Sequence, residues 1–330
     1  MSFKTGIILL SILSCLWTIS GCSGKRHIST PITIDKNAIT DVVYGNNNDW
    51  KGNSTSLTMD IYSPPVMQEG KKYPLVLFIH GGGYLTGDKK SASDKCSILA
   101  DSGFIAVSID YRLGWDKGTG QCNGNTYELE NAGYRAIQDA NAALRFLVSE
   151  ADKYSIDTNW IFLSGSSAGA ITAICATYLD DNNIKAYYPA SANALGSLVS
   201  ASNNLTNKYS IKGISSISGG IPDTNLIRTG KVVPAILFHG ALDETVPPEY
   251  GHFYSCANYP YISGGISVYR TIARKNVPVI AHILTDAGHG HDGESGYSDE
   301  YKMSETANFF HNLIQKSPQP SGIFYSTSKN

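Results

Sequence analysis

Short apolar runs of strand length alternate with helical patterns along the chain, and this alternation constrains the fold more than any other feature. Most of the runs are nearly continuous in apolar residues, as in strands that are covered on both faces. They are LTMDIY (57–62), LVLFI (75–79), FIAVSI (104–109), WIFLS (160–164), GISSI (213–217), AILFH (235–239) and VIAHIL (279–284). Helical periodicity occurs in 93–103, 131–154, 168–180, 266–276 and 305–316. The pattern predicts an α/β fold with a mostly parallel central sheet, helices on both faces and an antiparallel start.

The composition favours a single folded domain. The chain has 330 residues, of which 42% are hydrophobic and 16% charged, so it can bury a large core. No internal repeat or second composition regime divides it, and we expect the domain to span residues 51–316, with a polar C-terminal tail at 317–330. The formal net charge of -2 offers no basic surface for a nucleic acid, which we therefore exclude as a partner.

The N-terminus has the pattern of a targeting segment. Lys4 precedes an apolar run at 6–19, which as a helix would be only about 21 Å long, too short to span a membrane well. We therefore expect a signal peptide at 1–21. Ser20 and Gly21 before Cys22 resemble a relaxed bacterial lipoprotein box, which predicts a lipidated Cys22 as the mature N-terminus and the sole membrane attachment. The alternative is ordinary signal cleavage, with Cys22 incidental.

Export would bring the remaining cysteines into an oxidising compartment, periplasmic or on the cell envelope. Residues 22–50 would then be a tether plus the N-terminal edge of the fold. Cys96 and Cys175 lie in helical apolar patterns and are expected to be buried free thiols. Cys122 lies in a polar loop, and of the three pairings that four cysteines allow we expect the one with Cys256.

Residues 180–210 lack clear periodicity between a predicted helix and the next strand. A segment of this length is uncommon in a compact domain unless it folds over a site or is mobile. We expect a small wall or cap near the site.

LSGSSAGA (163–170) joins a predicted strand to a predicted helix through the pattern GxSxG. Gly165 and Gly169 would let neighbouring chain pass close, while Ser167 at the apex would expose its hydroxyl at the C-terminal edge of the sheet. A Ser/Gly-rich turn without chemistry is the alternative. The strand before and the helix after favour the nucleophile.

A serine hydroxyl is a weak nucleophile and needs donors for the oxyanion. FIHGGGYLTGDK (78–89) leaves a predicted strand through three glycines. We expect the backbone N–H groups of Gly82 and Gly83 to form the oxyanion hole with the N–H of Ala168, next to the nucleophile. His80 is expected to hold this loop by hydrogen bonds.

The serine also needs a base and an orienting acid. Asp243 comes directly beyond the strand end in FHGALDETVPP, and Glu244 is its competitor. In TDAGHGHDG, His289 comes first after the small-residue turn, and His291 is the alternative. No further ligands stand at a recognisable spacing from these histidines, so we expect neither a metal nor an organic cofactor.

These motifs together resemble the α/β-hydrolases of the carboxylesterase and hormone-sensitive-lipase-like group. The residues that carry the resemblance are LTMDIYSPP, HGGGYLTGDK, SIDYRLG, GSSAG, HGALDETVP and AGHGH, spread from about residue 55 to 312. The resemblance implies the α/β-hydrolase fold and a serine esterase with Ser167 as nucleophile, His289 as base and Asp243 as orienting acid. It also implies that the DYRL segment supports the site, where we expect Asp110 and Arg112 to form a partly buried charge pair and Asp139 to be structural.

An exported esterase would suit the removal of acetyl or feruloyl groups from glycans, so we expect a small-molecule or glycan-linked ester as substrate. Two other interpretations stay open. One is an amidase, such as a formamidase, which would use the same triad on an amide bond. The other is a non-catalytic binding module built on the same fold.

Overall fold

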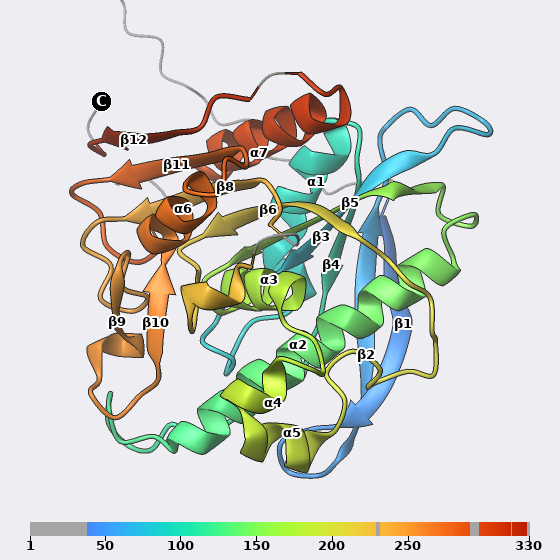
Figure 1. Cartoon of the computed structure of the whole chain (residues 1–330). Coiled ribbons are helices and arrows are strands. Elements are labelled where there is room, and N and C mark those ends of the chain that lie inside the picture. Colours follow the sequence, from blue (N-terminus) through green and yellow to red (C-terminus); the bar gives the residue numbers. More distant parts are fainter. Residues whose placement is uncertain (1–37, 229–231, 291–296, 318, 329–330) are drawn as a thin grey trace, which may run out of the picture. The chain divides into compact units, whose positions relative to one another are not determined.

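A nine-stranded sheet forms the centre of the computed structural model, which describes residues 38–228, 232–290, 297–317 and 319–328 (Figure 1). In spatial order its strands are β1 (Ala38–Asn48), β2 (Ser54–Tyr62), β4 (Ile105–Ile109), β3 (Tyr73–Ile79), β5 (Ile156–Ser166), β6 (Ile211–Ile217), β8 (Ala235–Gly240), β11 (Val279–Leu284) and β12 (Gly322–Ser326). The pairs β1–β2 and β2–β4 are antiparallel, and every later pair is parallel. The predicted mostly parallel sheet with an antiparallel start is confirmed.

Helices cover both faces of this sheet (Figure 1). One face carries α1 (Ser93–Asp101) and α7 (Asp299–Ile314), and the other carries α2 (Thr126–Ser149), α3 (Ala168–Tyr178) and α6 (Gly265–Ala273). Side chains alternate along β3 accordingly. Val76 and Phe78 pack into the core under α1 and α7, whereas Leu77 and Ile79 pack into the core under α2 and α3. A strand buried on both faces explains the nearly continuous apolar run.

Helix α2 begins before the predicted start at residue 131. Asn125 is the N-cap, and its side chain accepts a hydrogen bond from the backbone N–H of Glu128. Glu128 in the first turn also suits the positive end of the helix dipole. The first turn is polar, so hydrophobic periodicity does not reveal it.

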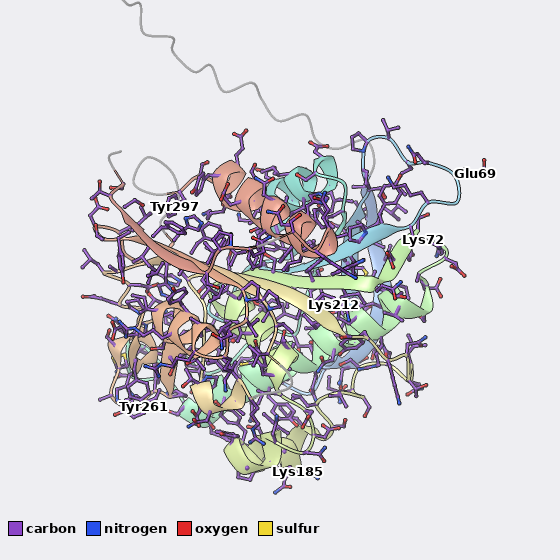
Figure 2. All side chains as sticks on the ribbon, turned by 45° about the horizontal axis from the view of Figure 1, so that its top comes forward. Glu69, Lys72, Lys185, Lys212, Tyr261 and Tyr297 are labelled. Carbon is purple, nitrogen blue, oxygen red and sulfur yellow. A yellow bond between two sulfur atoms is a disulfide. The ribbon has the colours of Figure 1, made fainter. Side chains whose placement is uncertain are left out.

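The C-terminal segment differs from the expected polar tail. Within 317–330, β12 pairs in parallel with β11 and adds the last strand of the sheet. Its side chains Phe324 and Tyr325 are 50% and 57% exposed, which is typical of an edge strand. A small second sheet was also not expected from the sequence. It comprises β7 (Gly220–Ile221), β10 (Tyr261–Gly264) and β9 (Tyr250–His252), and Tyr261 lies at the periphery of the molecule (Figure 2).

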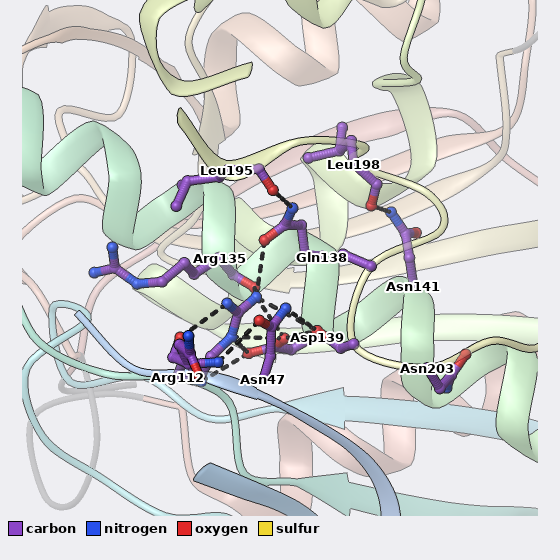
Figure 3. A network of polar contacts seen from close by, with 12 residues as sticks. Asn47, Arg112, Arg135, Gln138, Asp139, Asn141, Leu195, Leu198 and Asn203 are labelled. Carbon is purple, nitrogen blue, oxygen red and sulfur yellow. Dashed lines mark hydrogen bonds and ion pairs between the residues drawn. The ribbon is translucent and has the colours of Figure 1, made fainter. Parts of the chain in front are cut away.

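The aperiodic segment 180–210 is fixed to α2 by polar side chains. It forms two short helices, α4 (Ile184–Tyr187) and α5 (Pro189–Leu195), and then runs without regular structure. The Gln138 amide donates to the carbonyls of Leu195 and Ser197 at 2.9 Å each, and the Asn141 amide donates to that of Leu198 at 3.0 Å (Figure 3). The segment is therefore a wall that is tied to the helix beside it, and it needs no apolar periodicity of its own.

A buried ion pair lies at the centre of the same network (Figure 3). The Arg112 guanidinium donates from Nε to both carboxylate oxygens of Asp139, at 3.0 and 2.9 Å, and the two residues are 4% and 0% exposed. This corrects the expected pairing of Arg112 with Asp110. Asp110 instead contacts Lys89 at 3.3 Å and Thr58 at 2.7 Å, because the chain leaves the sheet after Ile109 and turns these two side chains toward different elements.

The cysteines are arranged as expected. Cys122 and Cys256 form a disulfide with their Cα atoms 5.3 Å apart, and Cys96 and Cys175 are buried and free. Burial raises the pKa of the Cys175 thiol to about 12, so this thiol is unreactive. In the part of the chain that the structure describes, no helix combines the length and the apolar character needed to cross a membrane.

Replacing Asp139 with Ala tests the buried pair. The variant leaves the Arg112 charge buried without its partner, which we expect to lower the free energy of unfolding by about 3–5 kcal/mol. Urea denaturation followed by circular dichroism measures the loss. The matched control is Asp152→Ala. Asp152 has a fully exposed side chain and pairs with Lys72, which lies at the surface (Figure 2). We expect little change in the control, and equal stabilities of the two variants would contradict the assigned role of Asp139.

Candidate active site

Ser167 occupies a strained turn between β5 and α3. Its backbone has φ 52° and ψ -122°, a left-handed conformation that residues with a side chain rarely adopt. Two hydrogen bonds hold it there: its N–H donates to the Ile217 carbonyl of β6 at 2.7 Å, and its own carbonyl accepts from the N–H of Ile171 at 2.9 Å. These two bonds hold the strained backbone of Ser167 in place, so that its hydroxyl points away from the sheet at the carboxyl edge.

The glycines around Ser167 permit a close approach of two chain segments. A Cβ atom on Gly169 would lie 2.0 Å from the Ile79 carbonyl oxygen, and one on Gly165 would lie 2.5 Å from the backbone of Gly169. Any side chain at either position would collide with backbone. Gly165 and Gly169 therefore allow the close passage that the sequence pattern predicts.

The structure brings the three predicted polar residues together in one hydrogen-bonded chain. His289 Nε2 lies 2.8 Å from Ser167 Oγ, and His289 Nδ1 lies 2.7 Å from Asp243 Oδ2. Ser167, Asp243 and His289 each follow the carboxyl end of a parallel strand, β5, β8 and β11. The competitor Glu244 is exposed, and the alternative base His291 lies outside the described residues.

Asp243 is held as a carboxylate. It is 4% exposed, and its Oδ1 accepts from the backbone N–H groups of Thr245 and Val246 at 2.9 Å each. Burial alone would raise its pKa, but the hydrogen bonds from His239 and His289 outweigh burial and hold the pKa of Asp243 well below its usual range. A permanent negative charge beside His289 Nδ1 keeps the proton on that nitrogen and leaves Nε2 free to accept one from Ser167.

His239 is a residue of this site that the sequence interpretation missed. It is 1% exposed, and its Nδ1 lies 3.3 Å from the N–H of Gly265, so Nδ1 accepts and Nε2 carries the proton. Nε2 then donates to the Val246 carbonyl at 2.8 Å and faces Asp243 Oδ2 at 3.2 Å. A histidine at the end of the strand before the predicted acid, in FHGALD, was the available signal.

In the loop after β3, the backbone N–H groups of Gly82 and Gly83 point away from the hydrogen bonds that the loop makes within itself. His80 Nδ1 lies 2.7 Å from the Gly81 carbonyl, and the Gly82 carbonyl accepts from the backbone N–H groups of Leu85 and Thr86 at 3.0 and 3.1 Å. Because C=O and N–H point in opposite directions across a trans peptide, these bonds turn the N–H groups of Gly82 and Gly83 the other way. Neither N–H donates to a backbone carbonyl among the described residues.

The segment that follows β4 supports this loop from behind. The Tyr111 hydroxyl donates to the His80 carbonyl at 3.0 Å, and the Trp115 indole N–H donates to the Gly83 carbonyl at 3.0 Å. The His80 ring also stacks on Tyr111 with a centroid distance of 4.4 Å. His80 is therefore placed to hold the loop, as expected. Ala168 begins α3, where the backbone N–H groups of the first turn lack partners within the helix.

A largely apolar pocket adjoins the serine turn. Ile171, one helical turn after Ser167, and Tyr84, next to Gly83, both line it. The other lining residues are Leu129, Glu130, Gly133, Tyr134, Ile137, Cys175, Leu179, Ile184, Tyr188, Pro222, Phe253, Pro260, Tyr261 and Ile262. Ile184 and Tyr188 belong to the segment 180–210, which thus forms one wall of the pocket as expected.

The disulfide lies beside another wall of the pocket. Cys256 lies within the segment that supplies Phe253, Pro260 and Tyr261 to the pocket. The Asn258 amide donates to the Cys122 carbonyl at 2.7 Å, so side-chain and covalent links join the same two loops. In the described parts of the chain, no group of three or more His, Cys, Asp or Glu side chains is arranged to hold a metal ion.

Several of the known proteins that this chain resembles are esterases. A family model described as BD-FAE matches residues 59–201, less than half of the chain. Carboxylesterase 3B of Mus musculus is 32% identical over 115 residues, which are 35% of this chain and 19% of that protein. The chain spans less than half the length of the curated relatives that it matches.

Solved structures resemble the fold over most of its length. A thermophilic esterase from Thermogutta terrifontis matches with a TM-score of 0.56 and 19% identity, over 84% of this chain and 93% of that one. A truncated carbohydrate esterase from gut microbiota matches with a TM-score of 0.55 and 15% identity, over 86% and 98%. The predicted α/β-hydrolase fold is confirmed.

The lowered pKa of Asp243 predicts a specific acid sensitivity. A group with a lowered pKa in the folded protein contributes stability above its unfolded pKa of about 3.9, and loses this contribution as the pH falls toward the folded value. We therefore expect the free energy of unfolding of the native protein to fall more steeply between about pH 5 and about pH 3 than that of Asp243→Asn. The control is Asp101→Asn at an exposed position on α1, which should follow the native curve. Parallel curves for the native protein and Asp243→Asn, measured by urea denaturation, would contradict the assignment.

Proposed function

We propose that this protein is a serine esterase that hydrolyses carboxylic esters through a covalent acyl-enzyme. The observation that carries the proposal is the bridging position of His289, at hydrogen-bond distance from both Ser167 Oγ and Asp243 Oδ2. The likeness to several esterases in sequence and in fold supports it. A binding module without catalysis would have no need for a strained serine with an oriented base.

The proposed mechanism uses only residues of this chain. Ser167 Oγ attacks the ester carbonyl carbon while His289 Nε2 takes the hydroxyl proton, and the carbonyl oxygen becomes an oxyanion facing the N–H groups of Gly82, Gly83 and Ala168. When the C–O bond to the alcohol breaks, His289 returns the proton to the departing oxygen. Water then attacks the acyl-enzyme by the same route, which releases the acid and restores Ser167. Asp243 stabilises the imidazolium in each step.

We further propose that the ester is carried on a glycan as an acetyl or feruloyl group. A pocket with apolar and aromatic walls suits an apolar acyl group, and one structural neighbour is a carbohydrate esterase. The disulfide between Cys122 and Cys256 supports an oxidising location for the protein, in line with export. Lipidation of Cys22, which lies outside the described residues, remains part of the proposed cell-envelope location.

Ser167→Ala tests the proposed nucleophile. We expect kcat for p-nitrophenyl esters to fall by about 10⁴ or more, because the acyl-enzyme can no longer form, while the thermal unfolding temperature changes little or rises. A fluorophosphonate probe followed by peptide mapping should modify Ser167 in the native protein and nothing in the variant.

A substrate panel separates the alternatives. We expect turnover of p-nitrophenyl acetate and methyl ferulate and much slower turnover of the matched anilide and amide. Preferred cleavage of the amides would make the protein an amidase with the same triad. A folded native protein that neither reacts with the probe nor turns over any panel member would favour the binding module.

A further inference from the structure

Glu130 is the one charged side chain that lines the pocket in the described part of the chain. It lies near the start of α2, and the walls around it are aliphatic, aromatic or phenolic. An acid is costly in such surroundings unless it has a partner, since burial removes water from the carboxylate. Glu130 is only partly buried, so its carboxylate can stay hydrated in the free protein and exchange that water for a ligand.

The position of Glu130 relative to the nucleophile follows from Tyr84. Tyr84 extends from the loop that carries Gly83, and a Cβ atom on Gly133 of α2 would lie 3.7 Å from the Tyr84 Cζ atom and 3.8 Å from its hydroxyl oxygen. Tyr84 therefore spans the gap between the oxyanion loop and α2. Glu130 precedes Gly133 by three residues, so both lie on the same side of that helix. Glu130 and Tyr84 therefore line the same pocket, and Tyr84 connects this part of α2 with the loop that carries Gly83.

The Glu130 side chain is partly buried, and among the described residues its carboxylate has no hydrogen bond or ion pair to another group of the protein. The Tyr134 hydroxyl, one turn further along α2, already donates to the Gly196 carbonyl at 2.7 Å. Burial raises the pKa of Glu130, as expected for a carboxylate that is partly removed from water. The burial of Tyr188 and, to a smaller extent, the nearby Glu130 charge raise the pKa of that phenol. The pocket thus contains an acceptor that the protein itself leaves unused.

We propose, on the basis of the proposed esterase function, that Glu130 is a specificity-determining residue that accepts a hydrogen bond from a hydroxyl group at the far end of the acyl group. The acyl group enters the pocket because the alcohol of a glycan ester is a bulky polar chain that has to remain in solvent. A neutral hydroxyl satisfies the carboxyl group at a lower desolvation cost than a cation would. The ester class selected is that of acyl groups with a rigid apolar body and a terminal hydroxyl.

Methyl 4-hydroxycinnamate and methyl 4-methoxycinnamate form the matched substrate pair, because they share the acyl body and differ in the terminal donor. The native enzyme should prefer the hydroxy ester by about 10-fold or more in kcat/KM, as a hydrogen bond to a charged group predicts. In Glu130→Leu this ratio should fall to about one, and in Glu130→Gln, which still accepts a hydrogen bond, it should be intermediate. Glu300→Gln on the exposed part of α7 is the control and should keep the native ratio.

The ratio distinguishes recognition from a structural role. A structural role for Glu130 would lower kcat/KM for both esters equally and leave the ratio as in the native enzyme, which would overturn the inference. A native ratio near one would also overturn it, even if both esters are cleaved. Cleavage of p-nitrophenyl acetate without cleavage of either cinnamate would overturn the inference and keep the esterase. Absence of all ester cleavage in folded protein would overturn the proposed function, and the inference with it.

Discussion

The parallel pairing of β3, β5, β6, β8 and β11 is the constraint on which the rest of the structure depends. Parallel strands end at the same edge of a sheet, so loops that are far apart in the sequence meet there. Residue Ser167 follows β5, Asp243 follows β8, and His289 follows β11. The antiparallel strands β1 and β2 lie at the opposite side of the sheet and contribute none of these three side chains. The site therefore depends first on the parallel direction of the strands and only then on the individual loops.

Side chains from neighbouring elements fix the glycine-rich loop after β3 and the carboxylate of Asp243. Glycines in the loop after β3 have no side chains with which to fix their peptide planes, and Tyr111, Trp115 and the His80 ring fix them instead. His239 does the same for Asp243 through a buried imidazole with a defined tautomer. A pre-oriented set of donors needs no rearrangement when charge develops on the substrate.

Much of this arrangement could be predicted because local signals and global fold agree. The apolar runs identified the seven inner strands, and the glycine spacing around Ser167 identified a turn that only small residues permit. The pairing of charged side chains was less predictable. Arg112 binds Asp139 rather than Asp110, since side-chain direction beyond a strand end depends on the helix packed above it. The edge strand β12 lies in a polar stretch and exposes Phe324 and Tyr325, so it lacks the buried apolar run of an inner strand, and the polar anchoring of 180–210 leaves no apolar pattern at all.

The wide spacing of Ser167, Asp243 and His289 along the chain has a consequence for folding. Each parallel pairing closes a long loop before it gains any contact, so sheets of this kind form slowly compared with helical proteins. The base of the site comes after β11, near the end of the chain, and it meets Ser167 only in the sheet in which β5, β6, β8 and β11 have all paired. A chain that is still being synthesised would thus be catalytically silent, and reactivity at Ser167 would report completion of the sheet rather than formation of its first half.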